Sequence, residues 1–254
     1  MSRSLELTEL FHLTLLLQIS RRLSGRPYAV KGGICLRLFH RSPRLSQDMD
    51  LDVAPQVRGG TLQNALDAIL QGQALLAALV PHGVLRLRST KPKQTDTTQR
   101  WKVSLELGGG VSLPTRIEFS RRRGDIPASS GIPDAALLSQ HRMPPFAAQF
   151  YDAIQMAVQK VTALAAPSRY AVRDLFDLHH LLRTVCVKPA EITPHVRPAQ
   201  IEQAVEKIRL FTPWDFTGQV VPYLPDTLAA HYRDPDAFAR LREDVAETLM
   251  AVLP

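Results

Sequence analysis

One short segment, residues 48–53, constrains the fold of this chain more than any other. It reads D-M-D-L-D-V, an alternation of acidic and apolar side chains with the two-residue period of a half-buried β-strand. Successive side chains of a strand point to opposite faces, so we expect Met49, Leu51 and Val53 to face the core. The three aspartates would then form a row of carboxylates on the other face of the sheet.

A Gly-Gly turn that opens a short helix precedes this strand. Residues 28–30 form a short apolar run, Gly32 and Gly33 end it, and apolar side chains at helical spacing continue from Ile34 to Phe39. The first N–H groups of a helix have no partner within the helix. A turn of this kind therefore presents backbone donors to an anion such as a phosphate.

The carboxylates on the strand are candidate metal ligands. Asp48 and Asp50 are two residues apart, which places them roughly 6–7 Å from each other on one face of a strand. Ligand sets made only of oxygen suit Mg²⁺, which keeps several waters and adds substrate phosphates to its shell. With the Gly-Gly turn, the pair predicts a site for a nucleoside triphosphate and its metal. Taken alone, Asp-x-Asp is more often an exposed strand face, and Gly-Gly an ordinary turn.

A third carboxylate for this site is available downstream. Residues 84–88, 102–107 and 113–119 are predicted strands, and in the last of them Arg116, Glu118 and Ser120 share one face. If that strand lies beside the aspartate strand, Glu118 joins the metal ligands. If it does not, Glu118 is a solvent-facing residue on an edge strand.

The rest of the chain is predicted to be mainly helical, which makes the fold class α+β. We expect a mixed sheet with flanking helices over residues 1–142 and a helical half over residues 143–254, with a connection rich in Pro, Gly and Ser over residues 124–145. The predicted helices cover residues 5–22, 61–80, 150–164, 168–184, 198–211 and 235–253, with Ser168 as an N-cap.

A second cluster of polar residues falls in two of the late helices. Lys160 emerges near the flank of the first helix, beside its apolar face. On the next helix, Arg173 precedes Asp174, and Arg173 and Asp177 are four residues apart and can form an ion pair. From the residues alone, these are ordinary charges on helix surfaces.

The charge balance favours a polyanionic partner. Lys and Arg number 31 against 24 Asp and Glu, which leaves a net charge of +7 and makes nucleic acid the first candidate. A basic loop beside a metal site would guide a phosphate backbone toward it, although charged loops are commonly only solvated. The residues of this predicted loop are Lys91, Lys93, Arg100, Lys102, Arg121, Arg122 and Arg123.

The remaining composition fits a cytoplasmic protein without a membrane segment. The apolar runs are too short to cross a bilayer, and residues 1–20 show no secretory signal. Two cysteines make no disulfide framework, and Cys35 is expected to be a buried thiol. We therefore expect a reducing compartment.

Two groups of motifs resemble one protein family. Lys31 to Leu36 reads K-G-G-x-x-L, and Arg44 to Leu51 reads R-L-S-x-D-M-D-L. Both resemble the first motif of the nucleotidyltransferase superfold and, within it, of the AbiEii/AbiGii family of toxin nucleotidyltransferases. Residues 159–164, Q-K-x-x-A-L, and 169–178, R-x-x-x-R-D-L-F-D-L, are similar to the later motifs of that family. Ile34 stands where the family generally has Thr or Ser, and Gln159 where it usually has Glu.

The resemblance implies roles for individual residues. Lys160 would neutralise charge on the triphosphate in the transition state, and Asp174 would orient Lys160 or accept the proton of the attacking hydroxyl. Lys31 and Arg44 would flank the pocket. The implied site has Asp48, Asp50, Lys160 and Asp174 as catalytic residues, Lys31, Gly32, Gly33, Arg44 and Ser46 as nucleotide-binding residues, and Asp48, Asp50 and Glu118 as Mg²⁺ ligands.

The expected function is a metal-dependent nucleotidyltransferase toxin held in check by a partner antitoxin. It would transfer NMP from an NTP to RNA, with the tRNA 3′ end as the expected acceptor, and release pyrophosphate. Two alternatives remain open: nucleotidylation of a protein or a small molecule, and a catalytically decayed module that binds a nucleotide or a partner. Ile34 is the residue that suggests decay.

Overall fold

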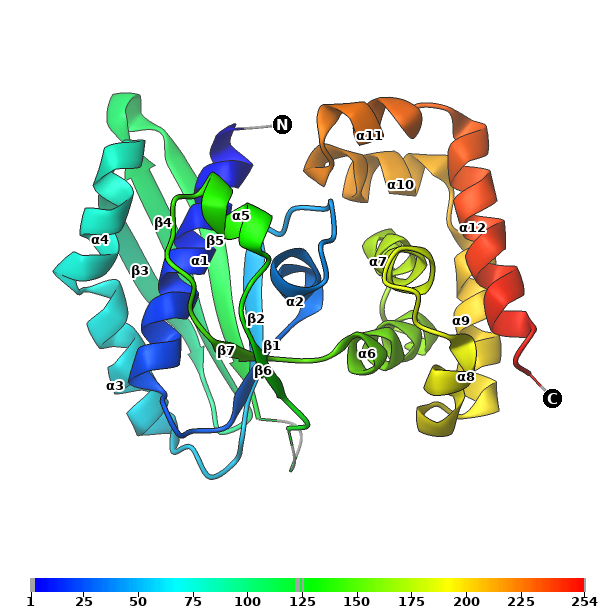
Figure 1. Ribbon diagram of the computed structural model, residues 1–254, viewed down its shortest axis with the longest axis horizontal. Coiled ribbons are helices and arrows are strands. Elements are labelled where there is room, and N and C mark those ends of the chain that lie inside the picture. Colours follow the sequence, from blue (N-terminus) through cyan, green and yellow to red (C-terminus); the bar gives the residue numbers. More distant parts are fainter. Residues whose placement is uncertain (1–2, 122–123, 125, 254) are drawn as a thin grey trace. The chain divides into compact units, whose positions relative to one another are not determined.

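The computed structural model describes residues 3–121, 124 and 126–253 (Figure 1). The chain forms two compact units. The sheet unit contains residues 3–41 and 45–151, and the helical unit contains residues 152–253 together with Ser42–Arg44. Three residues that precede the aspartate strand therefore belong to the helical unit. Arg122 and Arg123 of the predicted basic loop lie outside the described residues.

The sheet unit is built on a mixed sheet, which confirms the predicted α+β class. Its strands, within the described residues, follow the order β3-β4-β5-β2-β1-β7-β6. The pairs β2–β5 and β1–β7 are parallel, and the other neighbours are antiparallel. The strand bounds are β1 Tyr28–Lys31, β2 Asp48–Val53, β3 Val84–Gln94, β4 Thr98–Leu107, β5 Ser112–Ser120, β6 Ser129–Gly131 and β7 Ala148–Phe150.

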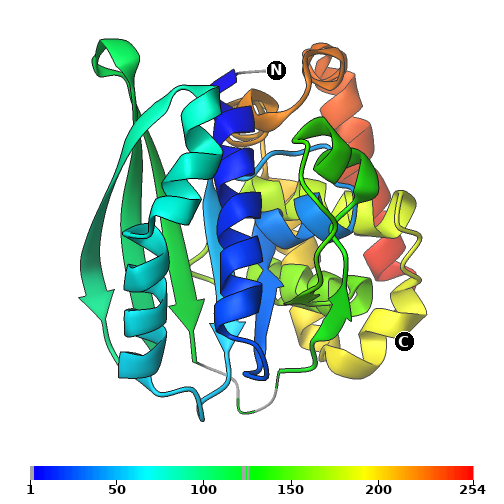
Figure 2. The same cartoon turned by 60° about the vertical axis from the view of Figure 1, so that its left-hand side comes forward.

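One face of this sheet is covered by helices. Figure 2 shows α1 (Arg3–Arg22), α3 (Gly59–Leu70) and α4 (Gln73–Leu79) packed together against it. The core between them includes the apolar side of β2 and, from β4 and β5, the fully buried Trp101 and Phe119. The period-two prediction for β2 is confirmed, because Met49, Leu51 and Val53 are all fully buried.

The prediction of a single helix over residues 61–80 is wrong. This segment contains two helices, α3 and α4, which are separated at Gly72, whose backbone is extended (φ −72°, ψ 139°). A Cβ at this position would lie 2.9 Å from the carbonyl oxygen of Ala68, so only glycine fits the break. The apolar pattern continues across Gly72 because both helices bury their apolar sides against β3 and α1.

The predicted basic loop and the Pro/Gly/Ser-rich connection contain regular structure. Lys91 and Lys93 belong to β3, and Arg100 and Lys102 belong to β4, so these side chains stand on a β-hairpin. The connection contains β6 and α5 (Ala135–Gln140), and β7 follows it. Both of these strands have three residues, which is too short for an alternating pattern to be recognised.

The helical unit confirms the four long helices predicted in the second half. They are α6 Ala153–Ala165, α7 Val172–Arg183, α9 Pro198–Leu210 and α12 Pro235–Met250. The shorter α8 (Pro189–Ile192), α10 (Pro213–Gln219) and α11 (Asp226–His231) were not predicted. Ser168 is not the N-cap of α7, because the helix begins four residues later with Ala171 in that position. None of the described helices has the length and apolar character needed to cross a bilayer.

Candidate active site

The three carboxylates predicted for the metal lie on adjacent strands of the sheet unit. In the parallel pairing of β2 with β5, Asp48 is the partner of Arg116 and Asp50 is the partner of Glu118. The strand that carries Glu118 therefore lies beside the aspartate strand, which is the arrangement required for Glu118 to join the metal ligands. Asp48 forms an ion pair of 2.7 Å with Arg116, and Glu118 forms one of 2.6 Å with Arg100.

Asp50 differs from the other two carboxylates. It is half-buried, and its carboxylate has no hydrogen-bond or ion-pair partner among the residues that the structure describes. Burial raises the pKa of Asp50 above its usual value. The positive charges of Arg116 and Lys31 oppose this shift, and the negative charges of Asp48 and Glu118 add to it. A cation placed at Asp50 would relieve both the burial cost and the repulsion between carboxylates.

Gly32 brings the backbone of the Gly-Gly turn close to Asp50. It is the first residue of α2 (Gly32–Phe39) and has a positive φ of 70°. A Cβ on Gly32 would lie 3.3 Å from the Oδ2 atom of Asp50. Lys31, the N-cap residue, makes no side-chain capping hydrogen bond. The start of α2 therefore lies against the unpaired carboxylate, and that helix end is suited to an anion.

Replacing Gly32 by alanine is expected to reduce the predicted nucleotide transfer about tenfold, because the new methyl group would push the carboxylate of Asp50 by a few tenths of an ångström. The positive φ adds a conformational cost of about 1–2 kcal/mol to folding. Gly25→Ala is a matched control, since Gly25 has a φ of 73° and no atom within 4 Å of the added Cβ. Initial rates and thermal melts of both variants test this prediction.

Equal losses of stability with a loss of activity only in Gly32→Ala would support the contact with Asp50. Equal activities in the two variants would show that the approach of Gly32 to Asp50 has no catalytic importance.

The other predicted nucleotide ligands of the sheet unit make internal contacts. The Nζ atom of Lys31 donates to Asp52 Oδ1 at 2.5 Å, and the hydroxyl of Tyr151 donates to Asp52 Oδ2 at 2.8 Å. The Ser46 hydroxyl donates to the carbonyl oxygen of Asp48 at 2.9 Å. Asp52 is thus buried and engaged, which leaves Asp48 and Asp50 as the acidic pair at the turn. The assignment of Lys31 and Ser46 to phosphates stays a prediction.

The helical unit contains the second cluster as a buried network of charges. Lys160 donates from Nζ to Asp174 Oδ1 at 2.8 Å and to Asp177 Oδ2 at 2.6 Å. Arg44 binds Asp177 with two hydrogen bonds of 2.8 and 2.7 Å. Arg169 donates to Asp174 at 2.6 Å. Alternating positive and negative groups therefore connect the Ser42–Arg44 segment to α6 and α7 within one unit.

Two expectations for these residues are corrected by the network. Lys160 does not lie at a helix flank, because its side chain is 8% exposed. Asp177 pairs with Arg44 and Lys160, and Arg173, four residues before it, is exposed. Helical spacing shows which residues are neighbours on one helix, but these partners come from another helix and from a distant segment.

The charges of the network are maintained despite burial. Burial acts to lower the pKa of Lys160, but the charges of Asp174 and Asp177 outweigh it and raise the pKa. Burial acts to raise the pKa of Asp174 and of Asp177, but their cationic partners hold both values below the usual range. Lys160 is therefore a fixed ammonium group that two carboxylates orient.

Several residues of these clusters were not singled out from the sequence as site residues. Arg116 and Arg100 neutralise Asp48 and Glu118, and Asp177 orients Lys160. Arg116 shares a face with Glu118 in the alternating pattern, so its position could be inferred, but its partner could not. Nothing local to Asp177 indicates that Arg44, 133 residues away, is its partner.

The carboxylates of Asp48 and Asp50 in the sheet unit are suitable ligands for a divalent cation. No three His, Cys, Asp or Glu side chains within the described part of the chain converge into a ready metal site. Glu118 is engaged by Arg100, whereas Asp50 is unpaired and Asp48 is 32% exposed. Two carboxylates completed by water and substrate phosphates are a donor set that suits Mg²⁺.

The predicted site residues are thus distributed between the two units. Asp48, Asp50, Glu118, the Gly-Gly turn, Lys31 and Ser46 belong to the sheet unit. Lys160, Asp174 and Arg44 belong to the helical unit. Each unit presents one polar cluster of its own.

Comparison with protein-family profiles identifies one family. Residues 14–248 match the sequence profile of the family described as "Nucleotidyl transferase AbiEii toxin, Type IV TA system". None of the curated proteins matches the chain.

Solved structures share the fold. MenT4, a nucleotidyltransferase toxin from Mycobacterium tuberculosis H37Rv, is 14% identical with a TM-score of 0.62, and the match covers 100% of this chain and 95% of that one. JHP933 from Helicobacter pylori is 16% identical with a TM-score of 0.56, over 96% and 94% of the two chains. A putative nucleotidyltransferase from H. pylori is 18% identical with a TM-score of 0.55, over 95% and 96%. At these identities the likeness is one of fold.

Proposed function

Since the chain belongs to the AbiEii family of nucleotidyltransferase toxins of type IV toxin–antitoxin systems, we propose that it transfers NMP from an NTP to the 3′ end of an RNA, with tRNA as the acceptor. The observation that carries the proposal is the unpaired carboxylate of Asp50 against the start of α2. Membership of the family implies a cognate antitoxin. We propose that the pair acts in the cytoplasm.

The proposed reaction forms one bond and breaks one bond at the α-phosphorus of the NTP. The oxygen of the acceptor 3′ hydroxyl bonds to that phosphorus, the hydroxyl proton passes to water, and the bond to the bridging oxygen breaks to release pyrophosphate. Asp48 and Asp50, with Glu118 as the third candidate, would hold Mg²⁺. When bound, Mg²⁺ supplies charge neutralisation of the phosphates and a lowered pKa for the attacking hydroxyl.

The remaining roles, phosphate binding and stabilisation of the leaving group, fall to backbone and side-chain groups of the chain. Gly32 and Gly33, the first two residues of α2, offer backbone N–H groups to the phosphates. Lys160 supplies a fixed positive charge that favours the negative charge developing on the leaving pyrophosphate. Asp174 orients the Lys160 ammonium group through a hydrogen bond of 2.8 Å. We propose that residues 143–254 complete the active site of residues 1–142 in this way.

Two residues of the motifs affect how the nucleotide would be bound. The Ile34 side chain carries no hydroxyl and is buried, so it offers no ligand to a phosphate. The Arg44 guanidinium is engaged by Asp177, and its proposed contact with the nucleotide requires exchange of that partner. The intact pair of Asp48 and Asp50 argues for catalysis and against a decayed binding module.

The net charge of +7 favours RNA over a protein side chain or a small molecule as the acceptor. The test is incubation of the purified protein with Mg²⁺, each α-labelled NTP in turn and total bacterial RNA. We expect label on RNA of tRNA size with one of the four nucleotides and none with γ-labelled NTP. Periodate oxidation of the RNA, which destroys the 3′-terminal diol, should abolish labelling.

The outcomes separate the alternatives. Label on a protein would identify a protein acceptor, and label on a small molecule would identify the antibiotic-modifying type of enzyme. Salt-sensitive RNA binding without label in any fraction would identify a binding module. Asp50→Ala serves as the inactive reference in each assay.

A further inference from the structure

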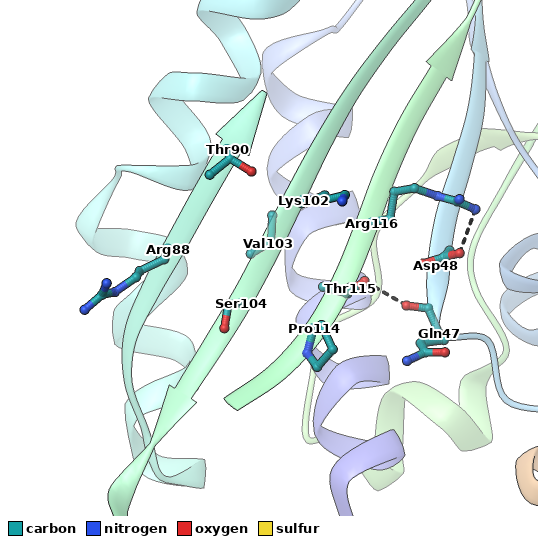
Figure 3. Close-up of a pocket in the computed structure, with 10 residues that line it drawn as sticks. All are labelled: Gln47, Asp48, Arg88, Thr90, Lys102, Val103, Ser104, Pro114, Thr115 and Arg116. Carbon is teal, nitrogen blue, oxygen red and sulfur yellow. Dashed lines mark hydrogen bonds and ion pairs between the residues drawn. The ribbon is translucent and has the colours of Figure 1, made fainter. Parts of the chain in front are cut away.

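The polar face of the β3–β5 sheet contains a cavity that the proposed reaction has not used. Its volume is about 480 Å³, and its lining includes Arg88, Thr90, Lys102 and Arg116, with Asp48 at one side (Figure 3). The opposite face of the same strands packs on helices through Trp101 and other buried residues. The cavity therefore lies on the face that carries the carboxylates of β2.

The register of the sheet places its polar side chains in one row. Thr90 of β3 pairs with Lys102 of β4, Lys102 pairs with Arg116 of β5, and Arg116 pairs with Asp48 of β2. Neighbouring strands are roughly 4.8 Å apart, so Lys102 stands two strands, or about 10 Å, from Asp48. Figure 3 shows the side chains of Lys102 and Arg116 extending toward Asp48.

The row carries positive charge that the protein only partly neutralises. Lys102 is exposed and forms no ion pair with any residue that the structure describes. Arg116 binds Asp48 through one terminal nitrogen, and its buried Nε atom has no hydrogen-bond partner among the described residues. Arg88 points away from the row and pairs with Glu106. Lys102 and Arg116 thus provide unused donors at the edge of the acidic pair.

We propose that Lys102 and Arg116 bind a backbone phosphate of the acceptor nucleic acid, next to its reacting 3′ end. This inference rests on the proposed nucleotide transfer. A nucleic-acid phosphate is a singly charged group with two free oxygens, and a lysine beside an arginine offers it a compact charge and directional donors. The single-stranded 3′ end lies along the polar face with its terminal hydroxyl at Asp48.

The order of the strands assigns this phosphate to the acceptor and not to the NTP. The Gly-Gly turn that receives the triphosphate follows β1, and Lys102 is on β4, so the acidic pair on β2 lies between them. In an in-line displacement, the attacking oxygen approaches the α-phosphorus from the side opposite to the leaving pyrophosphate. An acceptor bound across β4 and β5 satisfies this requirement.

Lys102→Gln tests the proposal, because Lys102 lies outside the catalytic groups. Binding of a short 5′-fluorescein-labelled single-stranded RNA is measured by anisotropy over a series of salt concentrations. We expect Kd to rise about fivefold near physiological ionic strength, and the slope of log K against log salt to fall by about 0.7, the contribution of one single-strand phosphate. In transfer assays, KM for RNA should rise while KM for the NTP stays unchanged.

Two further variants serve as controls. Lys188→Gln removes the same charge from an exposed position in the helical unit and should behave as the wild type. Lys102→Arg keeps a donor for the phosphate and should restore binding. Thermal melts of all three proteins establish that they are folded.

Equal RNA affinity in Lys102→Gln and Lys188→Gln would overturn the proposal, as would a rise only in KM for the NTP, which would assign the site to the triphosphate. Failure of the proposed function has a different signature, because the wild type then labels no RNA. Labelling of a protein by the wild type would assign the polar face to a protein acceptor and would also overturn the proposal.

Discussion

Asp50→Asn is expected to lower the rate of nucleotide transfer by about 10³-fold or more without reducing the stability of the fold. The substitution keeps the size of the side chain and removes the charge that would hold the metal. Loss of a metal ligand removes several kcal/mol of transition-state stabilisation, which corresponds to a rate factor of this order.

Stability is expected to be preserved because the ionised carboxylate of Asp50 destabilises the folded state. Burial and the neighbouring carboxylates of Asp48 and Glu118 raise the pKa of Asp50, so its ionised form is less favourable in the folded protein than in the unfolded chain. For an acid whose pKa is raised by folding, stability falls as the pH rises from the unfolded pKa through the folded pKa. A neutral asparagine side chain carries no such penalty, so the variant should be as stable as the wild type at neutral pH, or more stable.

The measurement combines initial rates of transfer with thermal melts at acidic and neutral pH. Asp236→Asn, at an exposed aspartate, is the control for the loss of one negative charge. Retained transfer by Asp50→Asn would exclude Asp50 as a metal ligand. A large loss of stability would instead show that its carboxylate has a structural partner.

Asp177→Asn is expected to lower the free energy of unfolding by about 3–5 kcal/mol, the range for breaking a buried ion pair by neutralising one partner. The Asp177 side chain is fully buried and accepts hydrogen bonds from Arg44 and Lys160. Neutralising it leaves two buried cations facing a single carboxylate, that of Asp174. Denaturant unfolding followed by circular dichroism measures the change.

The pH dependence of stability provides a second readout. The charges of Arg44 and Lys160 outweigh burial and hold the pKa of Asp177 far below its usual value. The stabilisation from Asp177 is therefore fully present above the unfolded pKa near 4 and is lost as the pH falls toward the folded pKa. The wild type should lose stability steeply from about pH 5 downward, and Asp177→Asn should lose less.

Asp244→Asn is the matched control, since the half-buried Asp244 pairs at 2.5 Å with Arg183, which is exposed. Exposed ion pairs contribute about 1 kcal/mol or less, so this variant should be close to the wild type. Similar stabilities for the Asp177 and Asp244 variants would show that the buried network contributes little to the fold.

Features that depend on local geometry could be predicted from the residues alone. The two faces of β2 follow from strict alternation, because side-chain direction in a strand is set by the backbone of the strand itself. The turn at Gly32 and the helix after it follow from residues next to one another in the chain. The motif pattern built on these segments was sufficient to indicate the family.

Which side chains contact one another depends on the packing of segments that are distant in the sequence. The predicted helix over residues 61–80 failed because a backbone break at Gly72 leaves the apolar pattern unchanged. The pairing of Arg116 with Asp48 depends on which strands are neighbours, and the burial of Lys160 depends on helix packing. Arg44 reaches Asp177 from 133 residues away. Such contacts arise from the register and packing of distant segments, which local periodicity does not encode.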